Sequence, residues 1–171
     1  MKISVITVTY NSAKTLRRTL ESVKAQDHPD IEHIIIDGSS TDDTVEMVKD
    51  FGITNWISEH DKGMYDAINK GIKMATGEVI GILNSDDCYS DDAILSQVAD
   101  AFSDDELEAI YGDIRFVQKH KGKTQRFYSA KRFHSGKFAW GYMPPHPSFY
   151  ARKATYEKLG GYQTDYTIAA D

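Results

Sequence analysis

Two adjacent aspartates, Asp86 and Asp87, come shortly after the apolar residues 80–83, with only Asn84 and Ser85 between them. The apolar run is typical of a buried strand, and in α/β proteins ligands gather beyond the carboxyl ends of parallel strands. Two like charges placed there repel each other, and their hard oxygen atoms suit Mg²⁺ or Mn²⁺. Alternatively, the pair only begins a turn before the next helix, as aspartate commonly does. The pair alone leaves both interpretations open.

Polar residues also stand at the ends of two earlier predicted strands. Thr9 and Asn11 lie at the end of the first strand, and Asp37 follows the predicted strand at 31–36, which ends in Ile34-Ile35-Ile36. Because the carboxyl ends of parallel strands meet at one edge of a sheet, we expect these side chains to form an acidic, hydroxyl-rich crevice there. That layout is typical of a nucleotide site in a doubly wound fold. The chain has neither a G-x-G-x-x-G fingerprint nor a Walker motif, which disfavours a NAD dehydrogenase or a P-loop enzyme.

The elements that must position these residues alternate between strand and helix. The predicted strands cover residues 3–9, 31–36, 56–58 and 79–83. Predicted helices cover residues 13–26 with Asn11 or Ser12 as the cap, a segment that starts at 41–44, residues 64–75, and a segment from 91 or 92 to 102. The third helix has the clearest apolar spacing, and Gly77 is expected to close it at C′. This order predicts an α/β fold with a parallel sheet and right-handed crossovers.

The remainder of the chain has a different pattern. Residues 109–119 and 123–128 are expected to pair as antiparallel strands around Lys121-Gly122. An aromatic, loop-rich segment follows, then a predicted strand at 148–150 and a short helix at 153–159. The chain contains no repeat and no linker, so we expect one domain.

Charge and composition narrow the class of protein. The formal net charge of −6 over 171 residues argues against broad nucleic-acid binding, which needs a basic face. An acidic protein that binds a phosphorylated ligand without a glycine-rich loop would use a metal to bridge the two negative partners. Cys88 is the only cysteine and no signal-like segment precedes the first strand, so we expect a cytoplasmic location. The chain stops at Asp171 without an evident terminal helix, which suggests truncation at the C-terminus.

Four motifs in order carry a resemblance to a known family. They are SVITVTYN at 4–11, IDGSSTDDT at 36–44, DKGMYDAINKG at 61–71 and LNSDD at 83–87. The chain therefore resembles an inverting family 2 glycosyltransferase of the GT-A fold, of the bacterial exopolysaccharide or lipopolysaccharide type. The resemblance implies a mixed, mainly parallel sheet flanked by helices, with a nucleotide-sugar-binding half at 1–103 and an antiparallel, acceptor-side half at 104–171.

The resemblance also implies roles for individual residues. Thr9 and Asp37 would contact the nucleotide base, Asn11 would lie in the same nucleotide site, and Asp86 would lie near ribose and metal. Asp87 would bind the Mn²⁺ or Mg²⁺ that bridges the diphosphate. The family places its catalytic base after a Gly-Gly-Tyr turn, which makes Asp171 the candidate base. Many relatives carry Glu immediately before this Asp, whereas this chain has Ala170.

Other candidate residues have two interpretations each. Asp66 and Asn69 would support the nucleotide or a loop, or Asp66 would only pair with Lys70 and the helix dipole. Lys62 would meet phosphate or remain solvated. His146 and Trp140 would lie on the substrate side. Alternatively, His146 is a hydrogen-bonded loop residue and Trp140 packs in the core.

One basic cluster lies around the predicted hairpin: Lys119, His120, Lys121, Lys123, Arg126, Lys131 and Arg132. In one interpretation this cluster is a solvated surface. In the other it contacts a lipid-pyrophosphate acceptor or an anionic membrane, and the protein would then work at the inner face of that membrane.

The expected activity is therefore metal-dependent, inverting transfer of a sugar from a nucleotide-diphosphate sugar, preferably a UDP-sugar, to a glycan or lipid-linked acceptor in cell-surface polysaccharide biosynthesis. A nucleotidyltransferase is a rival, but it should carry a Gly/Arg/Lys-rich loop after the first strand, where this chain has Thr9-Tyr10-Asn11-Ser12. A non-catalytic nucleotide- or glycan-binding fragment is the other.

Overall fold

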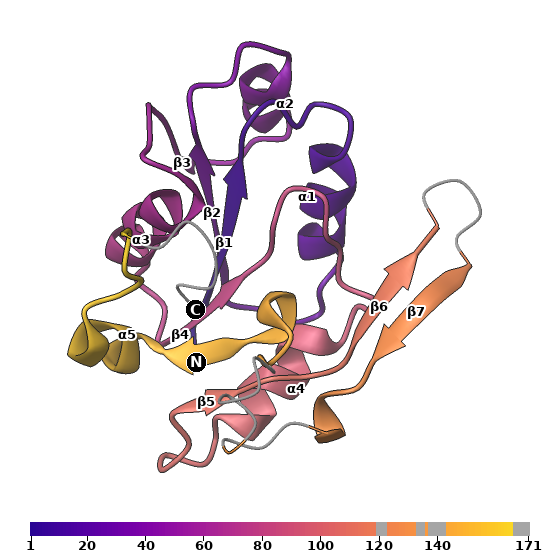
Figure 1. Ribbon diagram of the computed structural model, residues 1–171, viewed down its shortest axis with the longest axis vertical. Helices are drawn as coiled ribbons and strands as arrows, with labels where there is room; N and C mark the ends of the chain where they lie inside the picture. The colour runs from indigo at the N-terminus through magenta and orange to yellow at the C-terminus, as the bar shows by residue number, and fades with distance from the viewer. Residues whose placement is uncertain (119–122, 133–135, 137–142, 166–171) are drawn as a thin grey trace.

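A six-stranded mixed sheet forms the centre of the protein. The computed structural model describes residues 1–118, 123–132, 136 and 143–165. The strands of the central sheet are β1 (Ile3–Thr9), β2 (Ile31–Asp37), β3 (Asn55–Ser58), β4 (Val79–Ile82), β5 (Ala109–Ile110) and β8 (Tyr150–Arg152). Their spatial order is β3-β2-β1-β4-β8-β5 (Figure 1). The first four strands run parallel and β8 runs antiparallel to both of its neighbours, which confirms the expected α/β class.

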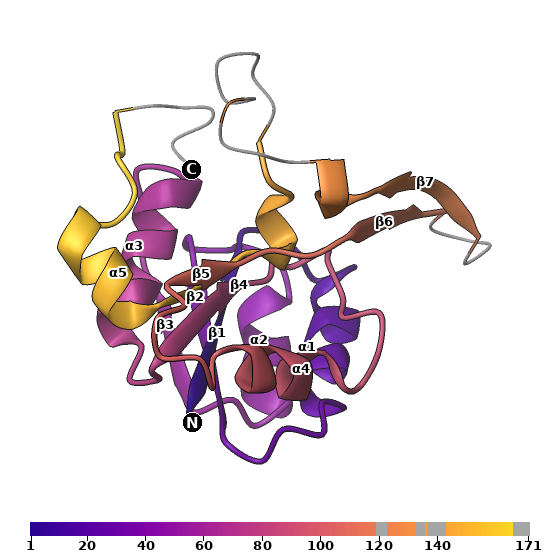
Figure 2. The same cartoon turned by 90° about the horizontal axis from the view of Figure 1, so that it is seen from below.

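Helices cover both faces of this sheet. They are α1 (Leu16–Lys24), α2 (Thr44–Asp50), α3 (Met64–Met74), α4 (Ile94–Ala101) and α5 (Lys153–Leu159). One apolar cluster joins the sheet to α3 and α5, and two others join its opposite face to α1, α2 and α4 (Figure 2). All seven residues of β1 are buried, which explains why this strand is so apolar. At Gly71, a Cβ atom would lie 2.5 Å from Ile6 Cγ2, so the glycine allows α3 to approach β1 closely.

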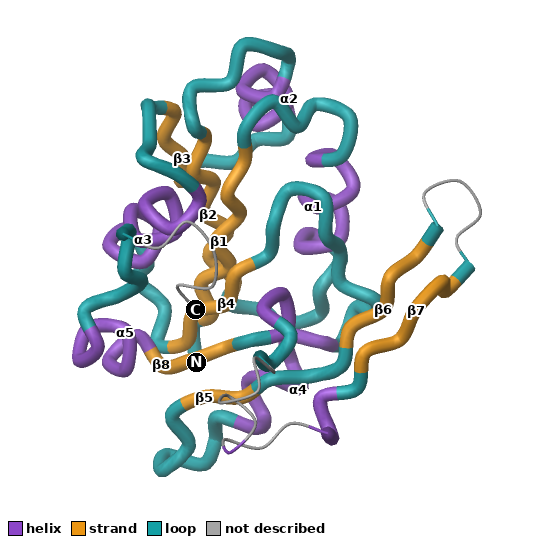
Figure 3. The backbone as a smooth tube through the Cα atoms, viewed as in Figure 1, coloured by secondary structure: helices purple, strands orange, loops and turns teal. Residues whose placement is uncertain are grey.

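A separate two-stranded antiparallel sheet consists of β6 (Ile114–Val117) and β7 (Thr124–Tyr128) (Figure 3). Two short 3₁₀ turns, η1 (Ala130–Arg132) and η3 (His146–Ser148), occur in the segments that follow it.

The prediction of one strand over residues 109–119 was wrong. The segment divides into β5, in the central sheet, and β6, in the hairpin, and the residues between them hydrogen-bond to other segments of the chain. The Ser148 hydroxyl donates to Gly112 O at 2.8 Å, and the Asp113 carboxylate accepts from Ala130 N at 2.7 Å. The predicted strand at 148–150 was also displaced: Ser148 belongs to η3, and the strand β8 begins at Tyr150.

Helix ends differ from the predicted ones for identifiable reasons. α1 begins at Leu16, and neither Asn11 nor Ser12 caps it with a side chain; the Ser12 carbonyl accepts from the Thr15 and Leu16 amides instead. α3 ends at Met74 and its cap residue Ala75 is extended, so the C′ role expected for Gly77 was wrong. A Cβ on Gly77 would lie 2.7 Å from Ser4 N, and close packing against β1 is therefore what demands this glycine.

Within the residues that the structure describes, no helix is both long and apolar enough to cross a membrane.

Candidate functional site

The carboxyl ends of the parallel strands meet at one edge of the sheet, as expected. In the strand register Thr9 lies opposite Asp37, and Asp37 lies opposite Ser58 of β3. The Gly38 amide donates to Thr9 O at 2.9 Å, which joins the loops that follow β1 and β2. The site is therefore built on loops whose starting points are set by neighbouring strands.

Asp37 is held in one orientation by hydroxyl and amide donors. Its side chain is almost fully buried, and its Oδ2 accepts from Ser40 N at 2.9 Å and from the Ser58 hydroxyl at 2.6 Å. Its Oδ1 accepts from the Ser40 hydroxyl at 2.5 Å. A carboxylate oxygen has two acceptor sites, so Oδ1 has the capacity for one further hydrogen bond.

Asn11 links the first two strand-end loops. Its backbone is left-handed, with φ 49°, a region that Asn tolerates better than most residues. The side-chain Oδ1 accepts from Thr41 N at 2.9 Å, and the backbone N–H donates to the Ser40 hydroxyl at 2.7 Å. In this structure Asn11 shapes the loop beside Asp37.

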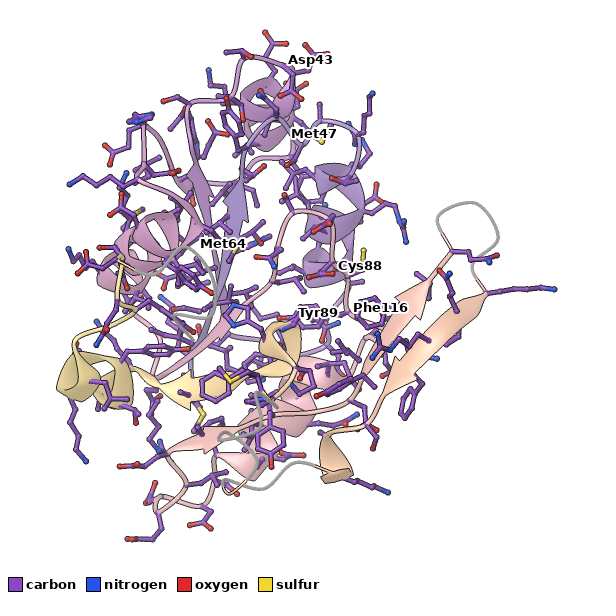
Figure 4. The ribbon with its side chains drawn as sticks, viewed as in Figure 1. Asp43, Met47, Met64, Cys88, Tyr89 and Phe116 are labelled. Carbon is purple, nitrogen blue, oxygen red and sulfur yellow. The ribbon has the colours of Figure 1, made fainter. Side chains whose placement is uncertain are left out.

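The Asp86–Asp87 pair follows β4 in a turn that is hydrogen-bonded to α1. The Asp87 amide donates to Asn84 O at 3.0 Å, and the Thr19 hydroxyl of α1 donates to Asp87 O at 2.7 Å. The Ser85 hydroxyl donates to the Ser12 hydroxyl at 2.9 Å, which joins this turn to the loop after β1. The adjoining residues Cys88 and Tyr89 lie on the same loop beside α1 and the central sheet (Figure 4). Neighbouring elements thus fix the backbone of the pair.

Negative charge is concentrated at the pair. Burial and the adjacent Asp86 charge raise the pKa of Asp87 to about 6, while His146 acts in the opposite direction. Asp86 is exposed and Asp87 is half-buried. A cation placed at these carboxylates would relieve the repulsion, and carboxylate oxygens suit Mg²⁺ or Mn²⁺. Among the described residues there is no group of three or more His, Cys, Asp or Glu that could hold a metal ion.

Two polar atoms at this edge lack partners within the described chain. They are Thr9 Oγ1, at the end of β1, and Asn84 Oδ1, just before the aspartate pair, and both atoms are buried. Buried polar atoms nearly always have a partner, so each is a position where a ligand or water is expected.

The start of α3 carries a network of charged groups. The Asp66 carboxylate accepts from Lys62 N at 3.0 Å and lies 3.8 Å from Lys70 Nζ, as its helical spacing predicted. Lys70 also pairs with Glu59 at 2.9 Å; the hydrogen bond to Glu59 raises the pKa of the lysine. Asp66 therefore supports the loop before its own helix, while the Lys62 side chain is exposed.

Asn69, three residues further along α3, contacts a distant loop. Its Nδ2 donates to Tyr162 O and its Oδ1 accepts from Tyr162 N, both at 2.8 Å. Of the two roles considered for Asn69, the described contacts correspond to loop support.

His146 lies between that loop and the aspartate pair. Its ring meets the ring of Tyr162 edge-on, with centroids 6.1 Å apart, and its charge acts on Asp87. The loop of His146 therefore belongs to the same edge of the molecule as the strand-end site. Trp140 and the candidate base Asp171 lie outside the described residues.

Three residues of this edge were not singled out as candidates from the sequence. Ser40 and Ser58 orient Asp37, and Asp61 lies against Gly38, where a Cβ atom would come within 2.6 Å of Asp61 Oδ2. Ser58 ends a parallel strand next to Asp37, and Asp61 opens the third quoted motif. The strand-end rule and the motif were the signals that could have identified them.

Comparisons with known proteins agree with this geometry. The model described as Glycosyl transferase family 2 matches residues 4–166. An uncharacterised glycosyltransferase of Mycobacterium tuberculosis is 36% identical over 176 residues, covering 99% of this chain and 65% of that protein. The poly-beta-1,6-N-acetyl-D-glucosamine synthase of Staphylococcus epidermidis is 33% identical over 129 residues, covering 72% of this chain and 31% of that protein. The chain thus spans just under two thirds of the length of its relatives with 36% identity.

Solved structures show the same fold. S. aureus TarS 1–349 in complex with UDP has a TM-score of 0.78 at 22% identity, covering 99% of this chain and 52% of that one. The mannosyltransferase PcManGT of Pyrobaculum calidifontis, in complex with GDP-Man and Mn²⁺, has a TM-score of 0.74 at 20% identity, covering 96% of this chain and 48% of that one. The strand order, the strand-end carboxylates and the family match lead to one conclusion: the chain belongs to glycosyl transferase family 2 and has the GT-A fold.

Proposed function

We propose that this chain binds a nucleotide-diphosphate sugar, preferably a UDP-sugar, and transfers the sugar with inversion to a glycan or lipid-linked acceptor in cell-surface polysaccharide biosynthesis. The observation that carries the proposal is the convergence of Asp37 and the Asp86–Asp87 pair at one sheet edge, in a member of this family. Residues 1–103 would form the donor half and residues 104–171 the acceptor half of one catalytic domain. We place the reaction in the cytoplasm, at the inner face of the membrane.

The two ends of the crevice would bind different parts of the donor, the base at one end and the diphosphate at the other. Asp37, oriented by Ser40 and Ser58, would accept a hydrogen bond from the base, with Thr9 Oγ1 as a second polar contact. Asp87 would hold Mn²⁺ or Mg²⁺ with Asp86 next to it. Such an ion, when bound, neutralises charge that develops on the leaving diphosphate. The raised pKa of Asp87 supports this assignment, because a bound cation would offset the burial and the Asp86 charge that disfavour the ionised carboxylate.

The transfer step would need a base on the side of the anomeric carbon opposite the leaving diphosphate. The acceptor hydroxyl would give its proton to the Asp171 carboxylate, as the family resemblance implies, while its oxygen forms a bond to the anomeric carbon. The bond between that carbon and the diphosphate oxygen would break, and the nucleoside diphosphate would leave with the electron pair. Attack opposite the leaving group inverts the configuration at the anomeric carbon.

A binding experiment tests the donor site. We expect UDP to bind more tightly with Mn²⁺ than without it in isothermal titration calorimetry, and Asp87→Asn to abolish that difference. Asp92→Asn is the matched control, because it removes the same charge from an exposed aspartate five positions later. Equal UDP affinity with and without Mn²⁺ in the parent protein would contradict the metal assignment.

Transfer activity separates the proposal from its alternatives. A non-catalytic module would bind UDP and Mn²⁺ but would release no UDP from a UDP-sugar in the presence of any acceptor. A nucleotidyltransferase would form a new phosphodiester bond and release pyrophosphate from UTP. The Thr9-Tyr10-Asn11-Ser12 loop carries neither glycine nor basic residues for a triphosphate, which favours the glycosyltransferase.

A further inference from the structure

The stretch of sequence that contains the β6–β7 hairpin is rich in positive charge. Residues 114–132 contain no Asp or Glu, although the formal net charge of the chain is −6. The cations of this stretch are Arg115, Lys119, Lys121, Lys123, Arg126, Lys131 and Arg132. The charge is thus segregated, which favours an anionic partner for this part of an otherwise acidic protein.

Large apolar side chains are exposed among these cations. Phe116, Val117 and Phe127 have 49%, 48% and 55% of their surface exposed. The Arg126 guanidinium lies 5.9 Å from the centre of the Phe116 ring, and Arg115 is the cross-strand partner of Phe127. Two of the cross-strand pairs, Arg115–Phe127 and Phe116–Arg126, therefore combine a ring with a guanidinium, and because successive strand residues alternate, one pair lies on each face of the hairpin.

The hairpin extends away from the rest of the protein. Two views at right angles show it projecting beyond the helices and the central sheet (Figures 1 and 2). A two-stranded sheet by itself is only marginally stable in water, and a hydrophobic face normally needs packing. Because Phe116 and Phe127 lie on opposite faces of the hairpin, their exposure indicates a partner into which the hairpin inserts rather than one laid on a single face.

We propose that the hairpin β6–β7 docks the protein on an anionic lipid bilayer. Aromatic side chains favour the interface between headgroups and acyl chains, while nearby Lys and Arg interact with anionic headgroups. The alternation of Phe116 and Phe127 with Arg115 and Arg126 meets both requirements. A second copy of the chain is a weaker candidate, because the nine strand residues are few beside the roughly 20–30 residues a side of a stable interface.

The hairpin is also connected to the loop that approaches the strand-end site. The Tyr128 hydroxyl donates to Met143 O at 3.1 Å, and His146 lies three positions after Met143. Docking would therefore bring the acceptor side of the site toward the membrane. This consequence rests on the proposed function, but the docking itself does not.

Vesicle co-sedimentation of the full chain tests the docking. We expect binding to phosphatidylcholine vesicles that contain phosphatidylglycerol and little binding to phosphatidylcholine alone. The variant Arg115→Ser/Lys123→Ser/Arg126→Ser should bind on the order of 100-fold more weakly, at about fivefold for each cation removed. The control Arg17→Ser/Lys73→Ser/Lys158→Ser changes net charge equally at exposed positions of α1, α3 and α5, and it should stay within about twofold of the parent.

A second variant tests the aromatic contribution. Phe116→Ser/Phe127→Ser leaves the charge intact, so its loss of binding should persist at high salt, where electrostatic attraction is screened. The idea fails if the parent protein does not prefer anionic vesicles, or if the hairpin variants bind as the control does. Hairpin-dependent dimers in sedimentation velocity without vesicle binding would overturn it in favour of a second copy.

Failure of docking and failure of the donor proposal are distinguishable. UDP titration measured on the same samples reports the donor site without using lipid. Lipid binding without UDP binding would refute only the proposed function, and UDP binding without lipid binding would refute only the docking.

Discussion

The side-chain amide of Asn69 pairs with both backbone polar groups of Tyr162, 93 positions later in the chain. The pairing needs space that only glycine leaves: Gly161 has φ +77°, and a Cβ atom there would lie 2.6 Å from Asn69 Oδ1. The Tyr162 ring also stacks on Tyr65 of α3, with centroids 5.6 Å apart. Helix α3 therefore fixes the segment that follows α5.

Loss of this pairing should affect transfer more than donor binding. Asn69→Ala removes two hydrogen bonds, each of about 1 kcal/mol, so we expect unfolding free energy to fall by about 1–3 kcal/mol. Because the segment after Tyr162 would lose its position, we expect kcat to fall about tenfold or more, while the Kd for UDP changes less than about twofold. Steady-state kinetics and calorimetry measure the two effects.

Gly161→Ala removes the same contact from the other side and should give the same kinetic pattern. The double variant should be little worse than either single one, because both changes break one interaction. Lys73→Ala, at an exposed position of the same helix, is the control. A UDP affinity that falls in proportion to kcat would show that Asn69 acts on the donor instead.

Gly81 of β4 should tolerate no side chain. An added Cβ would lie 2.2 Å from Cε1 of Tyr150, which is buried and whose hydroxyl donates to Tyr89 at 2.9 Å. Gly81→Ala is therefore expected to lower the unfolding free energy by about 1–3 kcal/mol in urea titration. Gly112→Ala meets only Ser148 Cβ at 3.8 Å and should change stability by less than about 0.5 kcal/mol. Similar urea midpoints for the two variants would contradict this account of β4 packing.

Glu32 should make stability depend on acid pH. Burial by itself would raise the pKa of this carboxylate, which is 7% exposed. Hydrogen bonds from Ser4 and Thr76, together with the nearby charge of Lys2, outweigh burial and lower the pKa from 4.5 to about 2. Because the folded-state pKa is depressed, the stabilisation is complete above pH 4.5 and is lost as the pH falls toward 2. The shift corresponds to about 3 kcal/mol at neutral pH.

Chemical denaturation between pH 7 and pH 2 measures this effect. Glu32→Gln should be less stable than the parent at pH 7, and the two proteins should converge as the pH approaches 2. Glu46→Gln, at an exposed position of α2, should run parallel to the parent throughout. A constant difference between parent and Glu32→Gln across this range would refute the titration of Glu32 as its cause.

Two substitutions distinguish the contribution of the Asn11 backbone conformation from that of its side-chain hydrogen bond. Asn11→Gly keeps the left-handed φ of 49° accessible but removes the acceptor for Thr41. Asn11→Ala removes the acceptor and adds backbone strain, so it should be less stable than Asn11→Gly by about 1 kcal/mol. Both should weaken UDP binding, because the loop beside Asp37 loses a tether. Equal stability of the two variants would mean that the loop relaxes out of this conformation.

The fold of the first 103 residues was predictable because its signals are local and mutually consistent. Apolar runs marked β1, β2 and β4, and the 3.6-residue spacing marked α3. The second half was less predictable because its strands are short and depend on distant partners. β5 and β8 have two and three residues, and each exists as a strand only beside the other and, for β8, beside β4.

The residues of the site also differ in how well the sequence predicted them. Asp37, Asp86 and Asp87 follow recognisable strands, and the strand-end rule placed them together. Ser58 and the pairing of Asn69 with Tyr162 depend on which segments become neighbours in space, and sequence separation says little about that.

The alternation of strands and helices could be read along the chain, as could the strand ends that carry carboxylates and the family. These follow from apolar periodicity and from motifs read along the chain. Three features depend on the folded chain: Ser40 and Ser58 orient Asp37, the pKa of Asp87 is raised, and Asn69 holds Tyr162. Hydrogen bonds and desolvation act over a few ångströms between residues far apart in sequence, so they exist only once the chain has folded.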